Sequence, residues 1–485
     1  MRERRQDASA EAPEVVSYLA MGLTTAPALD RAMAFAAEHA EGPLAEGMRG
    51  ALWDVHLRGR TRIEDAFLSV ADAWGSRDAD VKRAMYGIAH AVRDGSPETL
   101  ARALDRARTQ VFEGTRRRMR EYAASLRGPT TALFALGVLL PLIVSSMVPL
   151  LSVGSFSPSA VEVADRDQGN PLPWVLLLDV AFPAATFAFA HAVSSRRPRS
   201  GPRGFVRMRR VLMGAVAVPV AVLLTLSFPN PLVPVVAIGI AVGSLSVGLL
   251  SATRAAVREG RRREAVEREF PDALFQLGSR LQEGNGLESA FLAVADAAQG
   301  TECADLFRGI VHAMRFGGGT VEDALFGPGG ALERMPSRTV RASLKLVVDL
   351  AVKDPETAGR AALETSSHLR DLQGIEQDLR AELRPTVDAM RATATFFAPA
   401  VLGVSASLYG LLFRAFSTAA SLPMAPAAFA AALGVYLVLT AVGIVWFASR
   451  IAGQAWDGFA HQLGRALPVA YAVFLIAVLA SGSAL

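Results

Sequence analysis

The chain has 485 residues, of which 51% are hydrophobic and 20% are charged, and its formal net charge at pH 7 is +4. A mean hydropathy of +0.30 excludes an ordinary soluble protein with this many charges, so the apolar residues must be concentrated in segments. The single cysteine, Cys303, excludes an intrachain disulfide and a thiolate metal cluster. We expect it to be a small buried residue.

Two polar blocks alternate with two groups of apolar segments along the chain. Residues 1–130 form the first block, which begins MRERRQDASAEAPE; this stretch lacks the apolar core of a signal peptide, so we expect no cleaved leader. Four apolar runs within 131–252 and three within 394–485 flank the second block, 253–393. Each run is long enough to cross a bilayer. The seven predicted spans lie at about 131–151, 174–193, 211–228, 231–252, 394–415, 427–449 and 466–484.

The distribution of arginine predicts the orientation of these spans. The loop between the second and third spans, SSRRPRSGPRGFVRMRR, carries seven arginines, whereas SVGSFSPSAVEVADRDQGNPLP on the opposite side carries one. By the positive-inside rule, both polar blocks are cytoplasmic and the C-terminus is external. Because the arginines lie mainly beside the spans, where they meet anionic membrane lipids, we do not interpret the net charge as a sign of nucleic-acid binding.

The second half of the chain repeats the first. A shift of 258 residues aligns Glu64-Asp65-Ala66 with Glu322-Asp323-Ala324, and Pro97-Glu98-Thr99 with Pro355-Glu356-Thr357. One register over roughly 130 residues indicates a duplication. The repeated unit is a cytoplasmic domain followed by three spans, and one extra span returns the chain to the cytoplasm. We therefore predict an all-α polytopic membrane protein with four spans after the first domain and three after the second.

Within each domain the apolar residues recur at three- and four-residue steps, which is typical of amphipathic helices. In FPDALFQLGSRLQEGNGLESAFLAVADAA (270–298), the GNG at 284–286 predicts a turn with positive φ between two helices. The first copy has TTAP at this point, so we expect a different turn there. We find no sustained alternation that would predict strands.

The repeated acidic pair has two interpretations. Thr61 and Glu64 fit a capping box, and Thr320 can cap a helix whose first turn holds Glu322 and Asp323. Adjacent residues on a helix do not converge on one reacting atom, so we favour capping over catalysis. The alternative is an acidic edge that binds a partner.

Motif searches find no candidate enzyme site. The chain has no phosphate-binding G-x-x-x-x-G-K-[ST], no H-E-x-x-H and no G-x-S-x-G, and its seven histidines form no i, i+4 pair. We therefore expect no catalytic residue, no cofactor and no metal.

Charged residues give two further candidate sites. Asp179 and Arg414 each lie near the outer end of a predicted span, where they either pair with each other or reach the outer interface separately. The densest arginine clusters either set topology and contact lipid or bind a partner protein. They consist of Arg196, Arg197, Arg199, Arg203, Arg207, Arg209 and Arg210, and of Arg261, Arg262 and Arg263.

The second copy resembles the type II secretion system F domain family. The resemblance is carried by FPDALFQLGSRLQEGNGLESAFLAVAD, by GGGTVEDAL, and by the helical LRDLQGIEQDLRAELRPTVDAMRATATFFAPAVLG that runs into a span. The tandem arrangement looks most like the archaeal members, the platform proteins of type IV pili and tight-adherence-type systems.

The resemblance implies a non-enzymatic platform in the cytoplasmic membrane. Such a platform receives a cytoplasmic hexameric secretion ATPase and helps to move pilin-like subunits into a filament. Membrane lipids and a second copy of the chain are further expected partners, and nucleic acid is not one. Two alternatives remain open, a transporter built on repeats and a signalling scaffold. The parallel repeat and the lack of a polar pathway through the spans count against a transporter.

Overall fold

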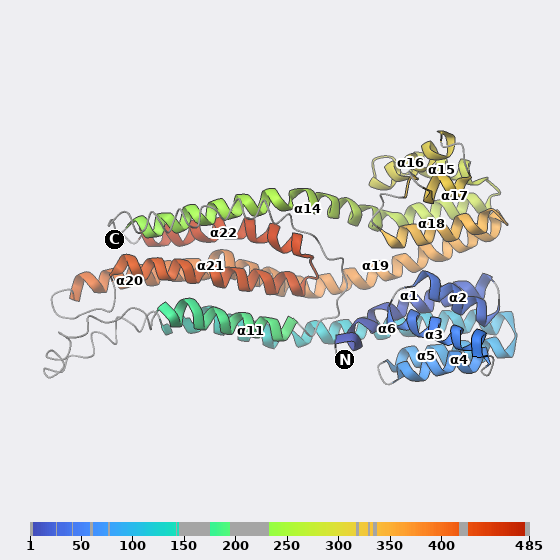
Figure 1. Ribbon diagram of the computed structural model, residues 1–485, viewed down its shortest axis with the longest axis horizontal. Helices are drawn as coiled ribbons and strands as arrows, with labels where there is room; N and C mark the ends of the chain where they lie inside the picture. The colour runs from blue at the N-terminus through green and yellow to red at the C-terminus, as the bar shows by residue number, and fades with distance from the viewer. Residues whose placement is uncertain are drawn as a thin grey trace. The chain divides into compact units, whose positions relative to one another are not determined.

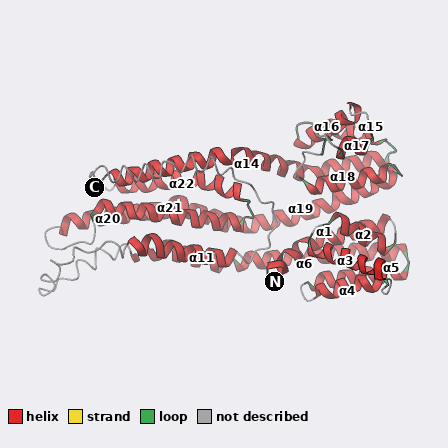
Figure 2. Ribbon diagram, viewed as in Figure 1, coloured by secondary structure: helices red, strands yellow, loops and turns green. Residues whose placement is uncertain are grey.

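The computed structural model shows an all-helical chain. It describes residues 3–25, 27–40, 42–58, 62–75, 78–141, 143–144, 175–194, 232–316, 320–327, 330–332, 337–416 and 425–480. Within these ranges every regular element is a helix and no strand occurs (Figure 2). The chain forms two compact units, and each combines a segment from both halves of the sequence. The first contains Met1–Glu121 and Arg258–Arg380, and the second Tyr122–Val257 and Ala381–Leu485.

The first unit contains two domains of short helices, labelled in Figure 1. The first domain comprises α1 (Glu3–Thr25), α2 (Leu29–His39), α3 (Pro43–Arg58), α4 (Ile63–Gly75), α5 (Ala79–Asp94) and most of α6 (Pro97–Ser125). The second comprises the end of α14 (Leu232–Gln282), α15 (Leu287–Ala297), α16 (Glu302–Phe316), α17 (Val321–Phe326), α18 (Arg338–Ala351) and most of α19 (Pro355–Ala392).

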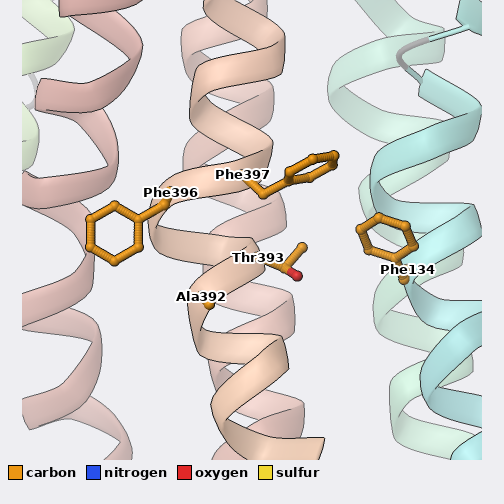
Figure 3. A pocket seen from close by; sticks show the side chains of 5 residues that line it. All are labelled: Phe134, Ala392, Thr393, Phe396 and Phe397. Atoms are coloured by element: carbon orange, nitrogen blue, oxygen red, sulfur yellow. The ribbon is translucent and has the colours of Figure 1, made fainter.

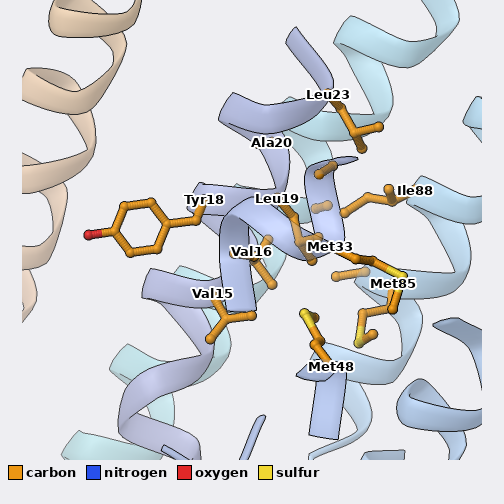
Figure 4. Close-up of a cluster of buried hydrophobic side chains, with 14 of the residues drawn as sticks. Val15, Val16, Tyr18, Leu19, Ala20, Leu23, Met33, Met48, Met85 and Ile88 are labelled. Carbon is orange, nitrogen blue, oxygen red and sulfur yellow. The ribbon is translucent and has the colours of Figure 1, made fainter. Parts of the chain in front are cut away.

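Each domain has its own hydrophobic core. In the first domain, Leu19 and Leu23 of α1 meet Met33, Met85 and Ile88 from α2 and α5 (Figure 4). The second core gathers buried leucines and phenylalanines of α14, α15 and α16, among them Leu274, Leu277, Phe291 and Phe307. Cys303 is buried in the second core, as predicted. Burial of these periodic apolar faces, rather than helix propensity alone, stabilises helices this short.

Three pairs of helices in the two domains start at positions one repeat register apart. Leu29 and Leu287 begin α2 and α15, Ile63 and Val321 begin α4 and α17, and Pro97 and Pro355 begin α6 and α19. Each pair is separated by the 258 residues of the sequence register. The loop glycines Gly42 and Gly300 are also one register apart, and both have positive φ, 104° and 88°. The turn at Gly284 has the predicted positive φ, 84°.

Five helices are long and apolar enough to cross a membrane within the described ranges. They are Leu176–Val193, Val233–Gln282, Pro355–Ala415, Pro426–Ile451 and Trp456–Ala480. They contain the second, fourth, fifth, sixth and seventh predicted spans. The third predicted span lies outside the described residues, and the first is described only as far as residue 144. The prediction of a helical membrane protein is thus confirmed.

The second unit includes three π-helical segments among its helices. Its elements are α7 (Arg127–Phe134), η1 (Ala135–Leu139), η2 (Leu176–Ala181), α11 (Phe182–Ser194), the start of α14, η3 (Thr393–Phe397), α20 (Ala398–Phe416), α21 (Pro426–Ile451) and α22 (Trp456–Ala480). The last helix, α22, begins ten residues before the predicted seventh span. The apolar run used for the prediction starts later than the helix, because the first turns of α22 contain the charged residues Asp457 and Arg465.

A proline follows each of the π-helices and explains its position. Pro141, Pro183 and Pro399 have no N–H to donate to the carbonyl four residues earlier. Those carbonyls belong to Gly137, Asp179 and Thr395, which lie inside η1, η2 and η3. A π-helical turn accommodates the missing bond. Because η1 and η3 are 258 residues apart, the same distortion occurs at the same point of both halves.

Side chains from other helices bond two of the carbonyls that prolines leave free. Tyr436 Oη of α21 donates to Gly137 O at 2.7 Å. In α14, Pro271 leaves the carbonyl of Glu267 free, and Gln373 Nε2 of α19 donates to it at 2.7 Å. Both bonds satisfy buried or half-buried carbonyls and tie helices that are distant in sequence.

We expect Gly359→Ala to destabilise the second domain, where α14 and α19 cross closely. A Cβ on Gly359 would lie 2.7 Å from Gly278 O and 2.9 Å from Gln282 N. Because both are backbone atoms, the helices must separate, and we expect the free energy of unfolding to fall by about 1–3 kcal/mol. Thermal unfolding of the detergent-solubilised protein measures this. Gly309→Ala, in α16 with open space around it, is the matched control; an equal effect there would contradict the close-crossing explanation.

Candidate functional site

The second acidic pair is a helix cap. Thr320 Oγ1 accepts a hydrogen bond from Asp323 N at 3.2 Å, and Asp323 Oδ2 accepts one from Thr320 N at 3.1 Å. These bonds complete a capping box. The Thr320 hydroxyl, which donates to Asp323 Oδ2 at 2.7 Å, and then the Thr320 backbone N–H lower the pKa of Asp323. In the first copy Glu64 and Asp65 lie in the first turn of α4, while Thr61 is outside the described residues. The capping interpretation is confirmed for Thr320.

The structure describes one of the two arginine clusters, Arg261, Arg262 and Arg263. Arg196, Arg197, Arg199, Arg203, Arg207, Arg209 and Arg210 all lie outside the described residues. In the second cluster, Arg262 Nε donates to Glu302 Oε2 and Arg263 Nε to Glu267 Oε1, each at 2.9 Å. Arg261 is exposed beside them on α14. Two of these three arginines therefore make ion pairs inside the second domain.

Asp179 and Arg414 are not brought together. Both lie in the second unit, but no ion pair joins their side chains in the part of the chain that the structure describes. Asp179 lies in η2, within electrostatic range of Tyr436, and its Oδ1 is buried without a hydrogen-bond partner. Arg414 is in the last turn of α20. Asp179 therefore has Tyr436 among its neighbours and makes no ion pair with Arg414, the partner that the pairing hypothesis proposed.

The two helical domains of the first unit share a packed surface that the sequence analysis did not identify. Tyr18 points out of the first core (Figure 4) and meets the ring of His368 edge-on, with centroids 6.5 Å apart. Phe112 of α6 meets the same imidazole at 5.7 Å. Thr365 lies 3.7 Å from the sulfur of Met21. Aromatic and apolar contacts from α1 and α6 thus cover one face of α19.

Ion pairs surround this apolar contact. Arg108 of α6 lies between Glu364 and Asp371 of α19, at 3.8 and 3.7 Å. Arg116 approaches Asp378 at 3.2 Å further along the same two helices. Arg108 and Glu364 are mostly buried, so this pair is less screened by solvent than an exposed one.

His368 is the polar group most affected by this contact. It is buried, and neither ring nitrogen has a hydrogen-bond partner. Burial, and then the positive charge of Arg108, lower its pKa to about 3. The residue lies in the polar part of α19, before the apolar span, and is a neutral imidazole at pH 7. A proton on it would place a second positive charge beside Arg108.

The corresponding face of the second domain is open. Residues 276, 279 and 293 align with Tyr18, Met21 and Phe35 in the repeat, but they are Gln276, Ser279 and Ala293. Here a groove of about 250 Å³ is present, lined by Phe275, Gln276, Ser279, Arg280, Glu283, Ala293, Val294 and Ala297. The aromatic pair Tyr18 and Phe35, 5.9 Å apart, lies at the equivalent place in the first domain. The two faces therefore differ in the chemistry of their side chains.

A second groove lies within the second unit, between α7 and η3. It has a volume of about 440 Å³ and is lined by Phe134, Ala392, Thr393, Phe396 and Phe397. The rings of Phe134 and Phe397 face each other across it, with centroids 5.9 Å apart, while Phe396 points away (Figure 3). The groove is therefore lined mainly by apolar side chains.

The described residues hold no group of three His, Cys, Asp or Glu side chains placed to share a metal ion. Burial, assisted by Glu269 and Asp272, raises the pKa of the Cys303 thiol to about 12. The thiol donates to Val266 O at 3.4 Å. This cysteine therefore packs as a neutral side chain.

Comparison with known proteins gives no relative: no protein-family model, curated protein or solved structure matches the chain.

Proposed function

We propose that the chain is the membrane platform of a system that assembles type IV pilus-like filaments or a related secretion apparatus. The observation that supports this most is the continuity of two long helices. α14 has 51 residues and α19 has 38, and each contains residues of both compact units. A helix that leaves a helical domain and becomes a membrane span is suited to carry force between the two.

In this proposal the first unit receives a cytoplasmic hexameric secretion ATPase, and the second unit accommodates pilin-like subunits. The architecture is a tandem repeat with four and three spans, both helical domains in the cytoplasm and the C-terminus outside. The chain itself performs no chemistry. Movement of the ATPase displaces the helical domains, and α19 conveys the displacement through Pro385 and η3 into α20.

Deletion of the gene is expected to abolish one type of surface filament. Electron microscopy of the deleted cells measures this, and the intact gene supplied on a plasmid should restore the filament. A flexible Gly-Ser insertion after Arg384 should fail to restore it, because the insertion interrupts α19 between the two units. The same insertion between Gly453 and Gln454, in the turn between α21 and α22, is the matched control.

Unchanged filaments after deletion, in a strain with no second copy, would contradict the proposal and favour the transporter or the signalling scaffold. Full restoration by the insertion after Arg384 would leave the platform in place but contradict transmission through α19. An insertion variant that is absent from the membrane fraction is distinguished by immunoblot.

A further inference from the structure

Asp179 is a carboxylic acid in an apolar helix, and no ion pair with it occurs among the residues that the structure describes. It lies in η2, the start of a segment long and apolar enough to cross a membrane. Its Oδ1 is buried without a hydrogen-bond partner, although the side chain as a whole is only half-buried. The carboxyl group therefore lies at the rim between the packed side of the helix and its open side.

The hydroxyl groups described around this carboxylate make no hydrogen bond to its Oδ1. The hydroxyl proton of Tyr436 is committed to Gly137 O at 2.7 Å, because Pro141 cannot bond that carbonyl. Thr186 Oγ1 donates to Phe182 O at 2.8 Å. Thr440 Oγ1 is buried beside Tyr436 but makes no hydrogen bond of good geometry. Tyr436 and Thr186 therefore donate elsewhere, and Asp179 Oδ1 receives no hydrogen bond in the described part of the chain.

The unsatisfied Oδ1 and the negative charge of Asp179 define the chemistry of what binds there. A carboxylate within a membrane is costly, and such residues almost always pair with another charge or line a water-filled cavity. Pro183 also leaves the backbone carbonyl of Asp179 without its usual donor. A ligand for this position must therefore bring hydrogen-bond donors and a positive charge.

The open side of η2 has the composition of a helix-binding surface. Leu176 and Val180 flank Asp179 and are 56% and 55% exposed, and Leu177 is also exposed. The third predicted span, 211–228, has no basic residue, so it cannot supply the missing charge. Large apolar side chains around a single carboxylate match the side of a membrane helix that carries a single basic residue.

We propose that η2 is the docking surface for a membrane-spanning helix of a partner protein, and that Asp179 receives a lysine or arginine of that helix. Leu176, Leu177 and Val180 pack against its apolar side chains. The inference does not depend on filament assembly, since it rests on the contacts of Asp179 alone.

A synthetic peptide tests this proposal. The probe is a leucine–alanine transmembrane helix with one arginine about two turns from its outer end and a photoactivatable leucine beside it. The full-length protein and the peptide are placed in phosphatidylcholine vesicles, which carry no net charge to attract the arginine. We expect the arginine peptide to crosslink about tenfold more than the same peptide with leucine in place of arginine, with the crosslinks on residues 176–180.

Asp179→Asn should abolish this preference, because it keeps the shape of the side chain and removes its charge. Asp457→Asn is the matched control: Asp457 is another carboxylate with a buried, unpartnered Oδ1, in the first turn of α22, and its loss should leave the crosslinks unchanged. Equal crosslinking of the arginine and leucine peptides, or of the arginine peptide to wild type and Asp179→Asn, would overturn the proposal. Size-exclusion chromatography confirms that each variant is folded, and a glutamate-bearing peptide should crosslink no more than the leucine peptide.

Discussion

Arg118→Ala is expected to lower the free energy of unfolding of the first domain by about 3 kcal/mol. Arg118 of α6 contacts the buried carboxylate of Asp78 through two N–O contacts, at 2.8 and 2.7 Å. Asp78 is also the N-cap of α5, where its Oδ1 accepts from the backbone N–H groups of Asp80 and Val81. Removing the guanidinium leaves a buried negative charge that only backbone N–H groups compensate. Chemical denaturation of the purified protein, followed by circular dichroism, measures the loss.

Two further variants distinguish the loss of a buried ion pair from a general effect of removing an arginine from α6. Arg102→Ala removes an exposed arginine on the same helix, 3.8 Å from Glu98, and should cost no more than a few tenths of a kcal/mol. Asp78→Asn combined with Arg118→Met removes both charges and keeps a side chain that can cap α5, so it should recover most of the stability. Equal losses for Arg102→Ala and Arg118→Ala would contradict the buried-pair explanation.

Local signals in the sequence predict the helices and several of their ends. Thr320 and Asp323 form the cap that the pattern Thr-Val-Glu-Asp indicates, and Gly284 adopts the positive φ that the GNG turn requires. The leucine spacing in 270–298 identifies the buried face of α14 correctly, since Leu274, Leu277 and Leu281 are all in the core. Such features depend on residues within one or two turns, and the sequence shows those neighbours directly.

The network at Asp78 depends on residues 37 to 40 positions away, and no local pattern reveals it. The internal repeat does not help, because the N-cap of the corresponding helix α18 is Ser337, which carries no charge. The packing of the two domains on each other did leave a signal in the differences between copies. Tyr18 is aromatic and bulky where its counterpart Gln276 is a polar amide, and such a change indicates a surface that is covered in one copy and open in the other.

The candidate membrane site was predictable only in part. Asp179 stands out as a charge in an apolar run, but the choice of Arg414 as its partner depended on depth alone. The neighbours that decide its environment, Tyr436 and Thr440, come from a span that is distant in sequence. The missing step was the effect of Pro141 on Gly137, whose free carbonyl accepts the hydroxyl proton of Tyr436 through a bond between helices.

The stability of the first unit is expected to fall as the pH decreases from about 7.5 to about 5.5, because His368 is buried without a partner. Its pKa is about 3 in the folded chain, against an ordinary value of 6.5 for a histidine in the unfolded chain. The unfolded state therefore binds more protons between these values, so the stabilisation is fully present above pH 6.5 and is lost as the pH falls. The slope approaches about 1.4 kcal/mol per pH unit for one proton.

The groups that face His368 determine how clearly this slope appears. Arg108 of α6 lowers the pKa further, and Tyr18 of α1 contributes a ring with no charge. Burial raises the pKa of Glu364, although Arg108 opposes this. The folded chain therefore takes up a proton at Glu364 before the unfolded chain does, which opposes the effect of His368 at the acidic end. For this reason the effect of His368 on stability is measured between about pH 7.5 and 5.5, which is above the range in which carboxyl groups titrate.

His368→Leu should remove this part of the pH dependence whatever its effect on stability at pH 7.5, because leucine binds no proton. Thermal unfolding of wild type and variant across the pH range, in the same detergent, measures the two slopes. His56→Leu is the matched control: His56 is exposed on α3, where its Nδ1 lies 2.8 Å from Leu52 O, and its loss should leave the slope unchanged. Identical slopes for wild type and His368→Leu would show that His368 is accessible to protons in the folded chain, and that α1, α6 and α19 do not pack around it as described.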